Sequence, residues 1–399
     1  MLRLQRILYY QRNWNFFDTL ILDKISFLMV GLTVALRLMI MSLFIDSPNF
    51  LLIYLSMILS ISFSSKNILL FYIFFELRII PIFIIIFYKG KQYERLTARL
   101  YLLIYTLLAS FPFLLFIINS YNSPTVWVLT ELNWFYKHNF LFLISYLAFL
   151  TKLPIFFLHI WLPKAHVEAP VYGSIILAGV ILKLGTYGLI KIIQVYYLNK
   201  INITWGVTLL VFFSVISGII CLFSVDLKVI IAISSVSHIT FLVSAFFLAE
   251  LESLRALIIN AISHGFISSN IFYILNCSYE RIKRRSVFLI KNMNFSTLLN
   301  SLILIIIISN FSAPPYLRFF REILLFINFI TVNKFIVIFR IFYMIITSFY
   351  SLFLFYSLKT NSSVLNTRKD IELKEWNIRI MLVNISLLMV LTIDFFILV

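Results

Sequence analysis

The chain has little charge and few of the residues that build stapled or repetitive proteins. Only 12% of its 399 residues are charged and 62% are hydrophobic, so polar side chains could not cover soluble domains of this size. Two cysteines, Cys221 and Cys277, exclude a disulfide scaffold and a zinc ribbon. Nine glycines and nine prolines exclude a collagen-like or low-complexity protein. The composition therefore places the chain in a membrane.

Patterns typical of cofactor sites are also absent. The sequence has no GxGxxG, Walker or HExxH pattern, and no predicted loop is long enough for a catalytic domain outside the membrane. A net charge of +17 would suggest a nucleic-acid partner for a soluble protein, but here membrane topology accounts for the positive residues. We therefore expect no cofactor, no metal and no nucleic acid.

Apolar runs long enough to cross a hydrocarbon core, which takes about 20 helical residues, recur from Ile25 to Val399. We predict helices at 26–47, 50–65, 68–88, 97–119, 139–160, 171–196, 204–223, 228–249, 253–276, 334–357 and 377–398. The run 292–330 is cut by Pro314 and Pro315 and counts as one broken crossing. The predicted fold is an all-α polytopic membrane protein with about twelve transmembrane helices.

Lysines and arginines between the predicted helices gather on one side. The loops 89–96, 161–170, 224–228, 279–291 and 358–376 hold fourteen of them, and the opposite loops hold only Lys137, Lys200 and Lys334. Both chain ends then lie on the less basic side, although residues 1–24 carry four basic residues. The basic loops indicate the cytoplasmic or matrix face of the membrane.

Ionisable side chains inside predicted spans are the candidate functional residues, because each costs about 2.5–3.5 kcal/mol to insert. Glu76 lies mid-span, five residues before Pro81. Lys152 stands two residues before Pro154, and His159 follows Lys152 by seven residues, which would place both on a similar face of one helix.

Further candidates follow along the chain. Lys183 lies between Gly179 and Gly185, which would let another helix approach closely. His238 and His264 lie on polar stripes of otherwise apolar helices, the first with Ser234 and the second with Asn260 and Ser268. Glu322 follows the proline pair.

These residues allow two interpretations. A buried carboxylate or lysine can pair to fix helix packing, serines and Asn260 can bond across helices, and a histidine can be a structural donor in the core. Alternatively, the series forms a proton path, in the order Glu76 with Lys152, then Lys183, then His264 or His238, then Glu322. In that case Lys152 contacts Glu76, and Lys183 is buried without a carboxylate beside it.

The stretches FLTKLP (149–154) and HIWLPKAHVEAP (159–170) resemble the antiporter-like subunits of mitochondrial NADH:ubiquinone oxidoreductase, respiratory complex I. The similarity continues in the same order through KLG (183–185), SVSH (235–238), SHG (263–265), YER (279–281) and the proline pair. The family usually has about two more helices at the N-terminus.

The resemblance implies two inverted five-helix repeats, 50–196 and 204–357, each with one discontinuous helix. Residues 1–49 precede these units and residues 358–399 follow them. It implies that Lys152 and Glu322 belong to the discontinuous helices, with Glu76 as the partner of Lys152 and Lys183 as the central lysine. It also implies a proton-translocating subunit of the mitochondrial inner membrane, without a redox centre, bound to other membrane-arm subunits and with its basic loops in the matrix. The 43 phenylalanines and 21 tyrosines also fit an A+T-rich organellar gene.

Five mid-helix arginines, Arg37, Arg78, Arg99, Arg321 and Arg340, depart from the small residues that the family tends to carry. Our hypothesis is that these five positions are encoded by AGA or AGG codons. Several animal mitochondrial codes read these codons as Ser or Gly, and here they were translated as Arg. Two other functions remain open for the whole chain. One is a free-standing cation/proton antiporter, and the other is a structural membrane subunit that has lost pumping.

Overall fold

The computed structural model describes residues 14–17, 20–44, 48–89, 94–119, 139–195, 204–247, 251–282, 286–287, 297–332, 334–359, 378–387 and 389. Most residues of the basic loops lie outside these ranges, as do Lys137 and Lys200. The described part is almost entirely helical, as predicted from the apolar runs.

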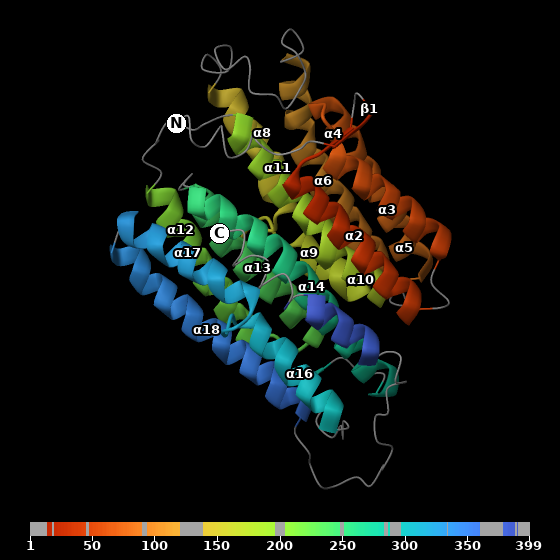
Figure 1. Ribbon diagram of the computed structural model, residues 1–399, viewed down its shortest axis with the longest axis vertical. Helices are drawn as coiled ribbons and strands as arrows, with labels where there is room; N and C mark the ends of the chain where they lie inside the picture. Colours follow the sequence, from red (N-terminus) through yellow and green to blue (C-terminus); the bar gives the residue numbers. More distant parts are fainter. Residues whose placement is uncertain are drawn as a thin grey trace.

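The first half of the chain forms α2 (Lys24–Leu43), α3 (Asn49–Ser64), α4 (Ile68–Leu77), α5 (Ile79–Lys89), α6 (Arg95–Asn119), α8 (Asn139–Lys152), α9 (Trp161–Glu168), α10 (Val171–Ile176), the π-helix η1 (Leu177–Ile181) and α11 (Leu182–Val195). The second half forms α12 (Thr204–Phe223), α13 (Leu227–Phe246), α14 (Leu251–Ile282), α16 (Thr297–Asn310), α17 (Leu317–Val332) and α18 (Lys334–Lys359). Figure 1 shows α2, α3, α5 and α6 on one side, α12, α16, α17 and α18 on the other, and α10, α11, α13 and α14 between them.

Among the described residues, eight helices are long and apolar enough to cross a membrane, and Asn49–Ser64, Leu298–Asn310 and Ile378–Leu387 are shorter apolar helices. With the broken α8–α9 segment, these correspond to the twelve predicted crossings. In the central span Val171–Lys191, every residue of the most apolar 18-residue window is buried. In α6 and α18 only a third of the corresponding window is buried. The outer helices turn large apolar side chains outward, which suits contact with lipid.

The structure bears out the all-α fold and adds two details to it. The predicted helix 68–88 is interrupted by a turn at Arg78, which separates α4 from α5. Before the first helix, β1 (Trp14–Phe17) and β2 (Leu20–Leu22) form a short antiparallel hairpin, and Leu20 also forms a bridge with Ser65. The sequence predicted neither feature.

The predicted helix 139–160 is broken next to Pro154, as expected. Proline lacks a backbone N–H and clashes with the preceding helical turn, and α8 ends at Lys152. Residues 153–160 are irregular, with Phe157 at a positive φ of 78°. The indole nitrogen of Trp161 donates to the carbonyl of Thr151 at 3.0 Å, so protein satisfies a carbonyl that the break exposes.

The second predicted break lies between α16 and α17. Residues 311–316 are non-helical, and Ser312 has a φ of 68°. The guanidinium of Arg318 donates to both the carbonyl and the side-chain oxygen of Asn310, at 2.6 and 2.5 Å. Each break is therefore bridged by a side chain that bonds to a backbone carbonyl on the far side.

Candidate functional site

Lys152 and Glu76 form a direct ion pair across α8 and α4. The Lys152 amine lies 2.6 Å from Glu76 Oε1, and Lys152 is only 2% exposed. The amine also lies 4.0 Å from the centre of the Phe75 ring. The predicted contact between the two residues is confirmed, and the pair lies where the proline break ends α8.

Arg78 is completely enclosed beside this pair. Its guanidinium donates to the carbonyls of Phe75 at 2.8 Å and Ile181 at 2.9 Å. These bonds connect the turn between α4 and α5 to the end of η1. A fixed positive charge therefore lies near Lys152 and Glu76, and it is an electrostatic neighbour of both.

Lys183 is buried, and among the described residues it forms no ion pair with a carboxylate. Its amine donates to the carbonyl of Ala178 at 2.5 Å. Ala178 lies in η1, where the π-helical turn shifts the ordinary backbone hydrogen bonds. The prediction of a buried Lys183 without an adjacent carboxylate is thus confirmed within the described part of the chain.

Glycines bring the surroundings of the two lysines together. A Cβ placed on Gly185 would lie 2.7 Å from the side chain of Leu153, the residue after Lys152. A Cβ on Gly179 would lie 2.4 Å from the side chain of Leu36. The predicted close approach at both glycines is therefore present, and the α8 break packs directly on α11.

A group of histidines lies beyond Lys183. The electrostatic neighbours of His264 include Lys183 and His166, and the rings of His264 and His238 are 6.2 Å apart between centroids. His166 and His264 are buried, and neither ring has a nitrogen bonded to a described residue. The structure therefore brings Lys183 and both predicted histidines into one neighbourhood.

His166 is a candidate that the sequence analysis missed. It lies in α9, which we had assigned to a basic loop, but it is fully buried and its ring stacks on Phe272 at 4.8 Å. The signal that could have revealed it is its place in the HVEAP string. His159 shows the opposite error, since the irregular residues 153–160 remove the helical spacing that was to align it with Lys152.

His238 has a partner on each ring nitrogen. Its Nδ1 lies 2.5 Å from the Tyr343 hydroxyl and its Nε2 lies 2.6 Å from the Tyr350 hydroxyl. Ser234, predicted to share a polar stripe with His238, bonds back to the carbonyl of Ile231 at 2.8 Å. The serine thus makes a local helix contact, in line with the structural interpretation.

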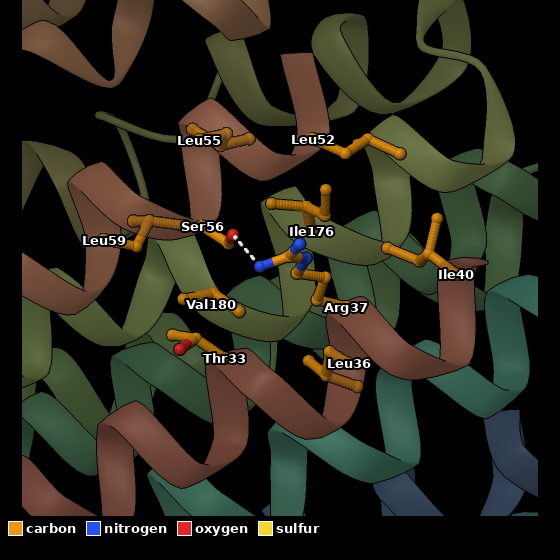
Figure 2. Close-up of a pocket in the computed structure, with 10 residues that line it drawn as sticks. All are labelled: Thr33, Leu36, Arg37, Ile40, Leu52, Leu55, Ser56, Leu59, Ile176 and Val180. Atoms are coloured by element: carbon orange, nitrogen blue, oxygen red, sulfur yellow. Dashed lines mark hydrogen bonds between the residues drawn. The ribbon is translucent and has the colours of Figure 1, made fainter. Parts of the chain in front are cut away.

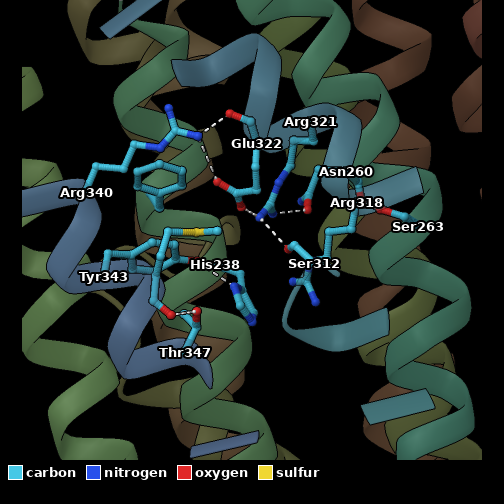
Figure 3. Close-up of polar contacts among 12 residues, drawn as sticks. His238, Asn260, Ser263, Ser312, Arg318, Arg321, Glu322, Arg340, Tyr343 and Thr347 are labelled. Carbon is cyan, nitrogen blue, oxygen red and sulfur yellow. Dashed lines mark hydrogen bonds and ion pairs between the residues drawn. The ribbon is translucent and has the colours of Figure 1, made fainter. Parts of the chain in front are cut away.

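Glu322 is held by two arginines, as Figure 3 shows. It forms ion pairs with Arg321 and Arg340, and Arg340 also donates to the Glu322 carbonyl. Arg321 in turn donates to Asn260 Oδ1 at 2.6 Å. Among the described residues, the acid at the end of the predicted path is therefore fixed between positive charges.

The other unexpected arginines have uncharged partners among the described residues. Arg37 donates to the Ser56 hydroxyl at 3.2 Å, beside a small hollow lined mainly by leucine and isoleucine (Figure 2). Arg99 donates to the carbonyl of Arg95 at 3.1 Å and lies over the Phe87 ring. The guanidinium groups of this set thus bond mostly to backbone and hydroxyl oxygens, and the codon hypothesis remains a prediction.

No group of three or more His, Cys, Asp or Glu side chains that could hold a metal ion occurs within the described ranges. Cys221 and Cys277 are buried and are not joined by a disulfide. Besides its arginines, the site thus consists of amines, carboxylates, imidazoles and hydroxyls. These groups can hold and exchange protons.

Comparison with known proteins gives both a family and a fold. Residues 65–349 match the family described as NADH:quinone oxidoreductase/Mrp antiporter, TM. NADH-ubiquinone oxidoreductase chain 4 of Rhipicephalus sanguineus is 33% identical over 396 residues, covering 96% of this chain and 90% of the relative. The chain 4 protein of Aedes aegypti is 39% identical over 289 residues, covering 71% of this chain and 64% of the relative.

Two solved assemblies contain chains of the same fold. Respiratory complex I from Thermus thermophilus matches with a TM-score of 0.79 at 20% identity, covering 96% of this chain and 84% of the other. The Mrp complex of a Dietzia species matches with a TM-score of 0.81 at 14% identity, covering 95% and 82%. The chain therefore belongs to the NADH:quinone oxidoreductase/Mrp antiporter transmembrane family, together with its relatives named NADH-ubiquinone oxidoreductase chain 4.

Proposed function

We propose that the chain is a proton-translocating subunit of the membrane arm of respiratory complex I. Its place is the mitochondrial inner membrane, with the basic loops in the matrix and other membrane-arm subunits as partners. Electron transfer from NADH to ubiquinone takes place in other subunits, and this chain holds no redox centre of its own. The names of its relatives support this assignment.

The observation that carries the proposal is the contrast between two buried lysines. Lys152 is paired with Glu76 at 2.6 Å at a broken helix, whereas Lys183 bonds to a backbone carbonyl and has no carboxylate partner in the described residues. An opposite charge favours the charged form of a lysine, and burial without one favours the neutral form. The two amines are therefore suited to give and take a proton in turn.

The pair of Lys152 and Glu76 would act as the switch. A signal from a neighbouring subunit that separates the two side chains leaves Lys152 buried without its counter-charge. The amine then releases its proton, and Lys183 is the next amine along the predicted order. When Glu76 returns, Lys152 takes up another proton, and the cycle can start again.

Beyond Lys183 the predicted path runs through the histidines to Glu322. His264 is an electrostatic neighbour of Lys183, and His238 lies next to His264. His166 joins the set because it is buried and has Lys228 and Lys183 as electrostatic neighbours. Glu322 can receive a proton only if its ion pairs with Arg321 and Arg340 loosen, since guanidinium groups stay charged and favour the ionised carboxylate.

Specific observations also favour the two alternatives. The fold shared with the Mrp complex fits a free-standing cation/proton antiporter that uses the same residues. The arginines that hold Glu322 fit a structural subunit in which the path is closed. Both alternatives share the fold and differ from our proposal in partners or in transport.

The test is purification from native membranes, followed by transport measurements. Migration of the chain in a large assembly with flavin and iron–sulfur subunits is the expected result, and a solitary chain would favour the antiporter. In closed vesicles, Lys183→Gln should abolish proton pumping. Lys191→Gln is the matched control, because Lys191 lies two turns further along α11 but is paired with Asp23. Equal pumping in both variants would support the structural alternative.

A further inference from the structure

His238 is enclosed by two tyrosine hydroxyls from a single neighbouring helix. Tyr343 and Tyr350 both lie in α18 and are seven residues apart, or about two turns. Their hydroxyls reach opposite nitrogens of the ring, at 2.5 Å from Nδ1 and 2.6 Å from Nε2. All three side chains are at most 1% exposed. We call this arrangement the Tyr–His–Tyr bracket.

The bracket satisfies the imidazole in both of its charge states. A neutral imidazole has one N–H donor and one acceptor nitrogen, whereas the cation has two donors. A tyrosine hydroxyl can donate or accept, and its hydrogen can rotate. The bracket therefore binds either form without moving the ring. His264 and His166 differ, because no described residue bonds to their ring nitrogens.

The two ends of the bracket face different surroundings. Tyr343 lies one turn from Arg340, which contacts Glu322, and its electrostatic neighbours are Arg318, Arg321 and Arg340. Its ring stacks on Phe241 at 4.4 Å, so the hydroxyl is held in place. Tyr350 has Ser237 and Cys221 as neighbours in addition to Tyr343 and Arg318, and it lies more than two turns further along α18 from Arg340. The Tyr343 end is therefore the one nearer to Glu322.

We propose that Tyr343 and Tyr350 are members of the proton path, with Tyr343 delivering protons from His238 toward Glu322. The proposal rests on the proposed function and adds two residues to its relay. Because an imidazole has no third nitrogen, protons reach the ring through Tyr350. The bracket is then a connection through His238 toward the terminal acid.

The transfer conserves charge and atoms. Tyr350 gives its hydroxyl proton to Nε2 while its oxygen takes a proton from water. The Nδ1 proton passes to the Tyr343 oxygen, whose own proton moves on toward Glu322. One proton has crossed and both tyrosines are again neutral, with the ring proton now on Nε2. The ring itself does not turn, and water that exchanges protons with the imidazole returns the ring proton from Nε2 to Nδ1 before the next transfer.

The experiment uses the assembled complex in closed vesicles and measures protons pumped per NADH oxidised. Tyr343→Phe and Tyr350→Phe keep the rings and remove one hydroxyl each. We expect each to lower pumping about tenfold, less than the hundredfold or more that a positioned acid–base group can contribute. Tyr187→Phe is the matched control, because that buried hydroxyl donates to the Phe63 carbonyl at 2.7 Å, and it should pump normally.

A second variant separates proton transfer from positioning. Tyr343→Gln offers the imidazole a hydrogen-bond partner but cannot pass a proton on, so it should pump as poorly as Tyr343→Phe. Tyr343→Gln also replaces Tyr343→Phe as the test variant if the latter does not assemble into the complex. The ratio of pumping rates in H₂O and D₂O should change in the bracket variants and stay the same in Tyr187→Phe. If the tyrosines had a purely structural role, this ratio would not change.

The outcomes distinguish this inference from the proposed function. If His238→Gln stops pumping but both phenylalanine variants or Tyr343→Gln pump at the control rate, the bracket is structural and the relay stands. If His238→Gln itself pumps normally, His238 and its bracket lie outside the path. Loss of pumping in Lys183→Gln together with normal pumping in every bracket variant likewise overturns only the bracket.

Discussion

The two broken helices hold their charged residues in opposite ways. At the α8–α9 break, Lys152 has one carboxylate partner, Glu76. At the α16–α17 break, the carboxylate Glu322 has two arginine partners, Arg321 and Arg340. A lysine can lose its proton when its surroundings change, but an arginine cannot. The cation at the first break can therefore lose its charge, whereas the cations at the second break keep theirs.

This difference shows that a helix break at proline does not by itself determine which acid–base chemistry takes place there. Both breaks follow from proline, and both are bridged by a side chain that bonds to a freed carbonyl, Trp161 at one and Arg318 at the other. The function depends on which ionisable groups then enter the opening. With three arginines and one glutamate, the second break carries an excess of positive charge.

Removal of Lys152 should have the largest effect. Lys152→Met leaves the partly buried Glu76 without its partner, which costs at most the roughly 3–5 kcal/mol of a broken buried pair. The double variant Lys152→Met, Glu76→Leu should recover most of this stability, because neither charge remains. Thermal unfolding in detergent measures the stability, and vesicle assays should show no pumping in either variant. A double variant as unstable as the single one would contradict the pair as described.

The difference between the two breaks depends on whether positions 321 and 340 really carry arginine. Under the codon hypothesis, protein from native membranes carries Ser or Gly at positions 37, 78, 99, 321 and 340, and Glu322 is then free of Arg321 and Arg340. Mass spectrometry of peptides covering these positions, with non-tryptic digestion, reads them directly. Peptides that contain arginine at all five would end the hypothesis and leave Glu322 held as described.

Close packing at the first break can be tested on α11. Gly188→Ala would place a Cβ 2.1 Å from the Phe149 ring, and such overpacking costs about 1–3 kcal/mol. Gly31→Ala in α2 is the control, because nothing lies within 4 Å of its Cβ position, and it should be neutral or stabilising. Similar unfolding temperatures for the two variants would show that α8 does not pack tightly on α11.

Removal of the Trp161 hydrogen bond that bridges the first break should have the smallest effect on stability. Trp161→Phe removes the indole donor to the Thr151 carbonyl, and one such bond is worth about 1 kcal/mol. Trp205→Phe is the control, because Trp205 is 81% exposed. A modest loss of thermal stability is expected for the first variant only. If both behave alike, the bridge contributes nothing measurable to holding α8 and α9 together.

Features set by local chemistry were predictable from the sequence. Apolar runs gave the crossings, and Pro154 and the pair Pro314–Pro315 gave both breaks, because proline disrupts a helix wherever it lies in the interior. The contact between Lys152 and Glu76 was also predicted. Opposite charges inside a membrane seek each other, since the alternative is an unpaired charge in lipid.

The missed features depend on packing between distant segments. His166 was assigned to a loop because its short helix has polar neighbours in sequence, and only the fold shows it to be buried. The turn at Arg78 depends on a bond to Ile181, about a hundred residues away. The bracket around His238 depends on α18. No local pattern carries information about such contacts.

The π-helical segment before Lys183 also has a consequence for the history of the chain. A π turn is an α-helix with one inserted residue, and each residue of an α-helix turns by about 100°. The direction of the Lys183 side chain therefore depends on one extra residue within 177–181. A relative in which this segment is an uninterrupted α-helix should be one residue shorter here. Deletion of one of these residues would turn the lysine toward a different neighbour while leaving the composition of the helix almost unchanged.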